Sequence, residues 1–199
     1  MPACDPADPF AALPAGAVVG TSSVRRQSQL LHRRPDLQVV MFRGNVQTRL
    51  RKLAEGEAAA TMLALAGLRR MGLNPPGSVA IDPEVMVPAA GQGIVGVTVR
   101  ADDTELHELL AAIEDPEARA VSSAERALLG ALDGSCRTPI GGHARLLEGG
   151  RLRLTGLVAR ADGSFLLQRT EEAPAADAVR LGEDLGRALR RDSPADLFA

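Results

Sequence analysis

The chain has 199 residues, which suits one or two domains with a buried core. Hydrophobic residues make up 45% of it and aromatic residues only 2%, with no Trp or Tyr. This composition excludes a disordered chain and disfavours nucleic-acid binding by base stacking. The formal net charge of -2 gives no global positive field that would attract DNA.

The chain has two cysteines, Cys4 and Cys136. Because Cys4 lies close to the terminus, a structural disulfide is not expected and a reducing compartment fits. The first residues include Asp5, Pro6 and Asp8 where a signal peptide would have a basic and then an apolar region. No apolar run is long enough to span a bilayer. The sequence therefore predicts a cytoplasmic protein.

The N-terminal part predicts a strand that leads into an anion-binding turn. Residues 1–16 are rich in Pro and Ala and are expected to be disordered or linker-like. An apolar run at 17–20 predicts a buried strand, and the hydroxyl-rich turn Gly20-Thr21-Ser22-Ser23 then opens a helix that ends at Pro35. Thr21 or Ser22 is the expected N-cap. Free backbone N–H groups at such a helix start favour an anion, although many α/β proteins contain this turn without a ligand.

Two further strand–helix pairs follow. Residues 37–42 alternate like a strand, and Arg43-Gly44-Asn45-Val46 forms a turn into a second helix. Residues 61–65 predict a third strand, although 57–66 could also form a helix by propensity, and a short helix is expected at 66–71. The alternating order predicts an α/β domain whose parallel sheet is covered on both faces.

Basic residues are concentrated between positions 25 and 52, where Asp36 is the one acid. Arg33 and Arg34 are expected to lie on a solvated helical face. Arg43 follows a strand, at the edge where open α/β sheets bind ligands. Together with the hydroxyl turn at 21–23, it predicts a pocket for several carboxylates or phosphates.

Residues 91–96 contain a formal G-x-G-x-x-G. We reject a dinucleotide site, because that motif requires a helix that opens at its glycines. Alternating β-branched residues from Ile94 to Val99 predict a strand instead.

The remaining residues predict a small α+β unit, with a boundary at about 100–104. The expected elements are helices at 103–113 and 117–132, strands at 140–147, 152–160 and 164–170, and a last helix at 176–190. Gly149-Gly150 and Asp162-Gly163 predict hairpin turns between the strands. An antiparallel three-stranded sheet with helices on one face follows from this order.

Cys136 lies between the helix at 117–132 and the first of these strands. The adjacent Arg137 favours a thiolate, yet a small apolar residue in a turn explains the cysteine alone equally well. The three histidines lack metal-ligand spacing, so no metal site is predicted. They are His32, His107 and His143.

Taken together, the motifs resemble porphobilinogen deaminase (hydroxymethylbilane synthase), a transferase of porphyrin and heme biosynthesis. They occur in the family's order from about Val18 onward. The residues that carry the resemblance are Gly20-Thr21-Ser22-Ser23-Val24-Arg25-Arg26, Arg43-Gly44-Asn45-Val46 with Thr48-Arg49-Leu50, Ala66-Gly67-Leu68, Pro88-Ala89-Ala90-Gly91-Gln92-Gly93, Ala124-Glu125-Arg126, and Gly134-Ser135-Cys136 with Pro139-Ile140-Gly141.

The resemblance implies a periplasmic-binding-protein-like parallel-sheet domain before the α+β domain. It implies that Cys136 holds a dipyrromethane cofactor through a thioether. It also implies a monomer that deaminates porphobilinogen and joins four units into linear hydroxymethylbilane, with no nucleic-acid or membrane partner. The residues implied to bind the acetate and propionate groups of cofactor and product are Thr21, Ser22, Ser23, Arg25, Arg26, Arg43, Gly44, Asn45, Arg49 and Gln92.

The sequence also departs from the family. The family's first domain supplies the catalytic aspartate and precedes the Gly-Thr-Ser-Ser motif, whereas this chain has only a short stretch there. We therefore expect that it lacks most of that domain, is inactive alone and leaves Cys136 without cofactor. Smaller departures are Ala59 and Thr98. The expected division is a terminus at 1–16, an α/β domain at 17–84, a segment at 85–103 and a C-terminal domain at 104–199.

The segment at 85–103 would return to the first domain in the family. Without that domain, residues 85–99 are expected to expose apolar surface and to drive self-association or pairing with a complementing domain. A non-catalytic module that binds polycarboxylates or oligomerises is the alternative function.

Overall fold

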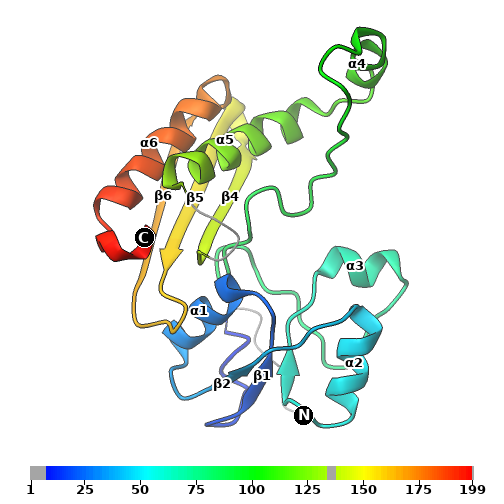
Figure 1. Cartoon of the computed structure of the whole chain (residues 1–199), viewed down its shortest axis with the longest axis vertical. Coiled ribbons are helices and arrows are strands. Elements are labelled where there is room, and N and C mark those ends of the chain that lie inside the picture. The colour runs from blue at the N-terminus through cyan, green and yellow to red at the C-terminus, as the bar shows by residue number, and fades with distance from the viewer. Residues whose placement is uncertain (1–7, 134–137, 199) are drawn as a thin grey trace.

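The computed structural model describes residues 8–133 and 138–198. It contains two units, each with its own three-stranded sheet, and a long connecting segment that carries helix α4 (Figure 1). The expected architecture, a parallel α/β sheet followed by an antiparallel α+β sheet, is confirmed.

The first unit is built on short parallel strands in the order β2-β1-β3. Val19 of the central strand pairs with Val39 on one side and Ala60 on the other. The strands are β1 (Val18–Gly20), β2 (Gln38–Val40) and β3 (Ala60–Thr61), and the helices are α1 (Val24–Arg33), α2 (Val46–Ala54) and α3 (Leu65–Arg70).

Residues 8–16 differ from the linker-like expectation. The side chain of Phe10 is buried with Val19 and Leu30 in the core of the first unit. Arg34 donates from Nη1 to the Phe10 carbonyl at 2.7 Å and is paired with Asp36 at 2.7 Å. The hydrogen bond from Arg34, followed by that from the Gly16 N–H, holds the pKa of Asp36 below its usual range. Arg34 therefore ties this segment to α1 and is no mere solvated side chain.

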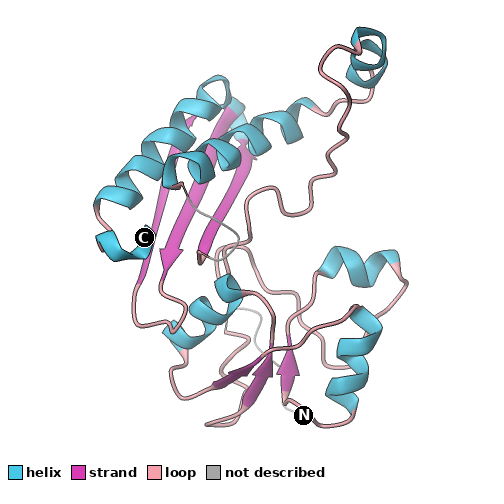
Figure 2. Ribbon diagram, viewed as in Figure 1, coloured by secondary structure: helices cyan, strands magenta, loops and turns pink. Residues whose placement is uncertain are grey.

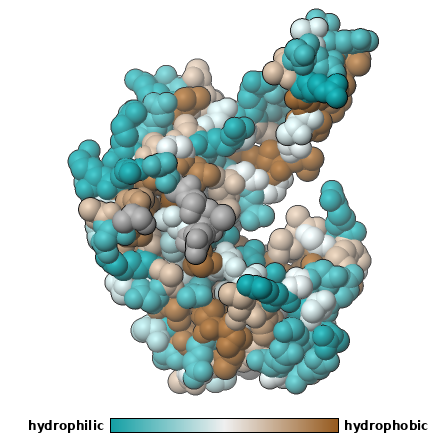
Figure 3. All heavy atoms as spheres, viewed as in Figure 1, coloured by the Kyte–Doolittle hydropathy of each residue, from teal (hydrophilic) through white to brown (hydrophobic). Residues whose placement is uncertain are grey.

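The connecting segment does not form the strand expected at 94–99. A strand needs a neighbour to satisfy its N–H and C=O groups, and in the described structure no strand lies beside these residues. The side chains of Val95 and Val97 are consequently 82% and 62% exposed. The segment continues into α4 (Thr104–Ala111), where Leu109 is also exposed. Figure 3 shows hydrophobic surface on this protruding arm.

The second unit pairs three long antiparallel strands in the order β4-β5-β6. Helices α5 and α6 cover one face of this sheet (Figure 2). The bounds are β4 (Ile140–Leu147), β5 (Arg151–Ala159), β6 (Leu166–Pro174), α5 (Pro116–Leu132) and α6 (Ala178–Arg191), with single 3-10 turns at Glu148–Gly150, Ala175–Asp177 and Ala195–Phe198.

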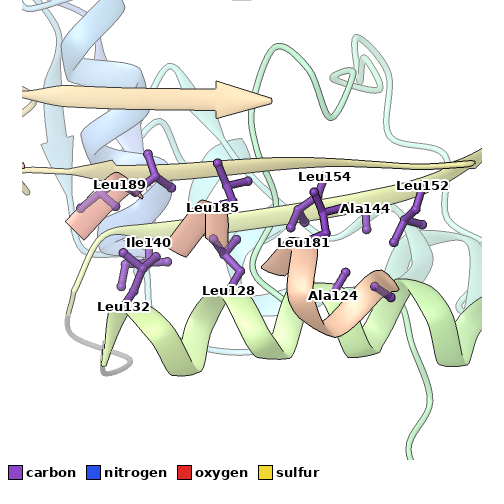
Figure 4. Close-up of a cluster of buried hydrophobic side chains, with 12 residues drawn as sticks. Ala124, Leu128, Leu132, Ile140, Ala144, Leu152, Leu154, Leu181, Leu185 and Leu189 are labelled. Carbon is purple, nitrogen blue, oxygen red and sulfur yellow. The ribbon is translucent and has the colours of Figure 1, made fainter. Parts of the chain in front are cut away.

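Aliphatic side chains make the core of the second unit, as the lack of aromatics requires. Leu128, Leu154 and Leu185 point into the layer between the helices and the sheet (Figure 4). The two helices approach closely because α6 presents Gly182 and Gly186 to α5. A Cβ at Gly182 would lie 2.7 Å from the Cβ of Ala127.

The two units contact each other through α1. Gln27 donates from Nε2 to the Ala161 carbonyl at 3.0 Å, and Nδ1 of His32 lies 2.9 Å from the Gly163 carbonyl oxygen. Val87 packs against Leu157 on the sheet. Within the described residues, no helix has the length and apolar character needed to cross a membrane.

Candidate functional site

The turn between β1 and α1 begins the site. Ser23 is the N-cap, because its hydroxyl accepts the Arg26 N–H at 3.4 Å, so the expectation of Thr21 or Ser22 was wrong. Thr21 lies two residues before this N-cap, where its own N–H still extends the sheet by donating to the Val40 carbonyl. Its hydroxyl instead accepts the Ser23 N–H at 3.2 Å. Ser22 remains exposed at the start of the helix.

Arg25, Arg26 and Arg49 form a group that we call the arginine cluster. Arg49 donates from Nη2 to the Ser22 hydroxyl at 2.9 Å, and Arg26 donates from Nη1 to the Met62 carbonyl at 2.9 Å. Burial and the charge of Arg49 lower the pKa of Arg26. Burial and the charge of Arg26 lower the pKa of Arg25 to about 10. Among the described residues, no acid forms an ion pair with these three side chains.

Arg25 is turned into the interface between the units and is only 8% exposed. It donates from Nη1 to the Val87 carbonyl. The buried amide of Gln29 accepts the Val87 N–H at 2.8 Å and donates to the Val87 carbonyl at 3.1 Å. Gln29 was not expected at the site from the sequence, although its place one helical turn after Arg25 is a signal that both share a face.

The turn at residues 43–45 lies beside the arginine cluster. The side chain of Asn45 caps α2 by accepting the Thr48 N–H at 2.9 Å. Gly44 has φ 113° and offers its carbonyl to Nε of Arg49 at 3.0 Å. Gly44 and Asn45 thus shape the turn, while Arg43 is exposed and donates to the sulfur of Met41 at 3.1 Å.

Gln92 lies in a turn after the Val87 contact, and its side chain is exposed. Within residues 8–133 and 138–198, that side chain makes no hydrogen bond to the arginine cluster. Cys136, the expected cofactor attachment, lies outside the described residues. The structure thus brings together Thr21, Ser22, Ser23, Arg26, Gly44, Asn45 and Arg49, but it buries Arg25, bonds Arg43 to Met41 and leaves Gln92 apart.

This arrangement favours anions. The N-terminus of α1 carries free backbone N–H groups and a positive dipole end. Arg26 and Arg49 add charge-assisted donors beside it, and their mutual repulsion is relieved when a carboxylate or phosphate binds. The donor set therefore fits a ligand with several carboxylates.

Two family models match the chain. Residues 4–108, more than half of it, match the model described as "Porphobilinogen deaminase, dipyromethane cofactor binding domain". Residues 120–191 match "Porphobilinogen deaminase, C-terminal domain". The chain belongs to the porphobilinogen deaminase family. The arginine cluster and Gln92 lie within the first match, and Cys136 lies within the second.

Curated relatives agree with this family. The porphobilinogen deaminase of Paracoccus denitrificans (strain Pd 1222) is 53% identical over 186 residues, which cover 94% of this chain and 59% of the relative. That of Nitrobacter hamburgensis is 48% identical over 186 residues, with 94% and 58% covered. That of Nitratidesulfovibrio vulgaris is 48% identical over 196 residues, with 96% and 62% covered. The chain thus spans about six-tenths of the length of these relatives.

Proposed function

We propose that this member of the porphobilinogen deaminase family binds the acetate and propionate groups of a pyrrole chain at the arginine cluster. The observation that carries the proposal is that Arg26 and Arg49 lie together at the start of α1, with Arg49 on the Ser22 hydroxyl, while no described acid pairs with either side chain. Each carboxylate that binds would offset the repulsion between these two arginines and gain charge-assisted hydrogen bonds.

The residues take distinct parts in this proposal. Arg26, Arg43 and Arg49 would donate to carboxylates, together with the backbone N–H group at Ser22. Ser23, whose own N–H donates to the Thr21 hydroxyl, would cap α1. Thr21, Gly44 and Asn45 would hold the two turns in shape, and Gln92 would add a neutral donor. Cys136 would anchor the dipyrromethane cofactor, which primes the growing chain when bound.

We further propose that the chain alone does not turn over porphobilinogen. Loss of ammonia and of a ring proton calls for a positioned carboxylate. Among the described residues, the charged groups that shift the pKa values of Arg25 and Arg26 are all arginines. This supports a chain whose described residues would bind the pyrrole groups but include no acid paired with the cluster to assist the reaction.

The Arg26→Leu substitution tests the binding site. Loss of a charge-assisted donor is expected to weaken binding of uroporphyrin I, a stable macrocycle with acetate and propionate groups, by about tenfold to a hundredfold. Fluorescence titration measures the dissociation constant. The matched control is Arg33→Leu, which removes the same charge from an exposed position on the same helix. If both variants lose the same affinity for uroporphyrin I, binding depends on the overall charge of the chain and not on a site at Arg26.

Incubation of the purified chain with porphobilinogen tests the second proposal. We expect no consumption of substrate, because no described acid stands at the site. We also expect an intact mass equal to the bare chain, with Cys136 as a free thiol. Steady turnover would sink the claim that the catalytic acid is absent, and a mass increased by a dipyrromethane would show that the chain loads its own cofactor.

The connecting segment and α4 expose apolar side chains. They support the alternative, a non-catalytic module that binds polycarboxylates or assembles with another chain. Val95, Val97, Leu109 and Ile113 are between 62% and 82% exposed. Such an apolar surface favours self-association or a complementing partner. Light scattering discriminates this alternative, since a clean monomer at high concentration would argue against self-association.

A further inference from the structure

The turn that carries Gln92 has little to hold it in place. Gly91 and Gly93 flank Gln92 with φ of 72° and 87°, and only local backbone hydrogen bonds link Gln92 to Ala89 and Ile94 to Gly91. In the described structure, the side chain that grips this turn is Glu125 of α5, whose Oε2 accepts the Gly91 N–H at 2.6 Å.

Glu125 is an unusual residue for its position. Its side chain is 3% exposed, and its Oε1 accepts the Ala144 N–H at 2.7 Å on the outer edge of β4. Desolvation raises the pKa of Glu125, while the two backbone hydrogen bonds oppose that rise. Nδ1 of His143 lies 3.8 Å from Oε1, but burial and the charge of Arg145 lower the pKa of His143, which favours the neutral ring. A buried carboxylate without a close ion pair is costly, so packing alone does not explain it.

The two oxygens of Glu125 join two segments that are far apart in the sequence. Next to Ala144, Gly142 donates its N–H to the Pro88 carbonyl at 2.9 Å. The stretch from Pro88 to Gly91 is thereby fixed along the edge of β4 at both of its ends. Val87, just before it, is held by Arg25 and Gln29.

Resting on the proposed function, we propose that Glu125 is a positioning residue for ligand binding. By fixing the backbone of Gly91, it holds the turn that carries Gln92, which is a neutral donor in the proposed function, although Glu125 itself touches no ligand. The C-terminal unit thus contributes to affinity at a site built by the first unit.

A double-mutant cycle tests this inference. The dissociation constant of uroporphyrin I is measured for the unsubstituted chain, Glu125→Gln, Gln92→Ala and the double variant. Each single change is expected to weaken binding by about threefold to tenfold, the size of one hydrogen bond, and the double variant is expected to bind no worse than Gln92→Ala. Additive losses, or unchanged affinity in Glu125→Gln, overturn the inference alone. No binding by the unsubstituted chain overturns the proposed function and this inference with it.

Two further measurements separate positioning from folding. Glu84→Gln is the control variant, because it removes the same charge from an exposed ion pair with Arg145 and should leave affinity unchanged. In the unsubstituted chain, the Gly91 amide proton is expected at low field and protected from exchange, as a bond to a buried carboxylate requires. Exchange of Gly91 at the rate of an open loop would refute the inference even if Glu125→Gln fails to fold.

Discussion

The Gly182→Ala substitution is expected to destabilise the second unit by about 3 kcal/mol. The added Cβ would lie 2.7 Å from the Cβ of Ala127 and 2.8 Å from the Leu128 backbone nitrogen. Both are backbone-fixed atoms of α5, so no side-chain rotation can make room. The two helices must separate, which opens the layer of leucines between them and the sheet. Urea denaturation followed by circular dichroism measures the loss.

The Gly130→Ala substitution is the matched control for this prediction. Gly130 lies inside α5, and a Cβ there meets no atom within 4 Å. The same chemical change should therefore stabilise the protein by about 0.5 to 1 kcal/mol, because alanine favours the helix over glycine. If the two variants shift the unfolding midpoint alike, the close approach of α5 and α6 is not a feature of the folded chain.

The Gly163→Ala substitution is expected to detach the β5–β6 hairpin from α1, at a cost of about 2 to 3 kcal/mol. Gly163 has φ 75°, and a Cβ there would lie 2.5 Å from the His32 backbone nitrogen and 2.6 Å from the Leu31 carbonyl carbon. The hydrogen bonds of Gln27 and His32 to the hairpin would be lost. Amide chemical shifts of α1 and the midpoint of urea unfolding report the change.

The Gly149→Ala substitution separates strain from contact. Gly149 has nearly the same φ, 73°, but a Cβ there meets nothing within 4 Å. It should cost only the backbone strain, about 1 kcal/mol, and leave the amide shifts of α1 in place. Similar costs and shifts for both glycines would contradict a docked hairpin.

The two sheets were predictable because most of their strands show local apolar patterning. The third strand was expected at 61–65, whereas β3 is Ala60–Thr61 and α3 already begins at Leu65. Failures arose where an element depends on a distant neighbour. Ile94 to Val99 alternates as a strand does, yet no described strand lies beside it. Phe10 lies in a segment of loop-like composition, yet its side chain is buried. Arg34 holds this segment by donating hydrogen bonds to the carbonyls of Phe10 and Leu13. The helix begins one residue later than Ser22 would allow, with Ser23 as its N-cap, while Thr21 is still hydrogen-bonded to the sheet.

The site residues also divide into those that local patterns predict and those that depend on distant contacts. Arg49 and Ser22 could be grouped in advance, because consecutive parallel strands end at the same edge of the sheet. The burial of Arg25 could not, since it depends on Val87, which lies 62 residues away along the chain. Glu125 appeared in the sequence only as part of the Ala124-Glu125-Arg126 motif, with no role predicted for its side chain. Its contacts with Gly91 and Ala144 follow from how α5 packs, which no local pattern encodes.

The contact between α1 and the hairpin has a kinetic consequence. The hydrogen bond from Gln27 to Ala161 joins residues that are 134 positions apart, whereas Arg49 and Ser22 are separated by only 27. Closing the loop between Gln27 and Ala161 therefore costs more chain entropy before the contact can stabilise it. The contact between Arg49 and Ser22 can therefore form early in folding, and the attachment of α1 to the second unit comes as a late step.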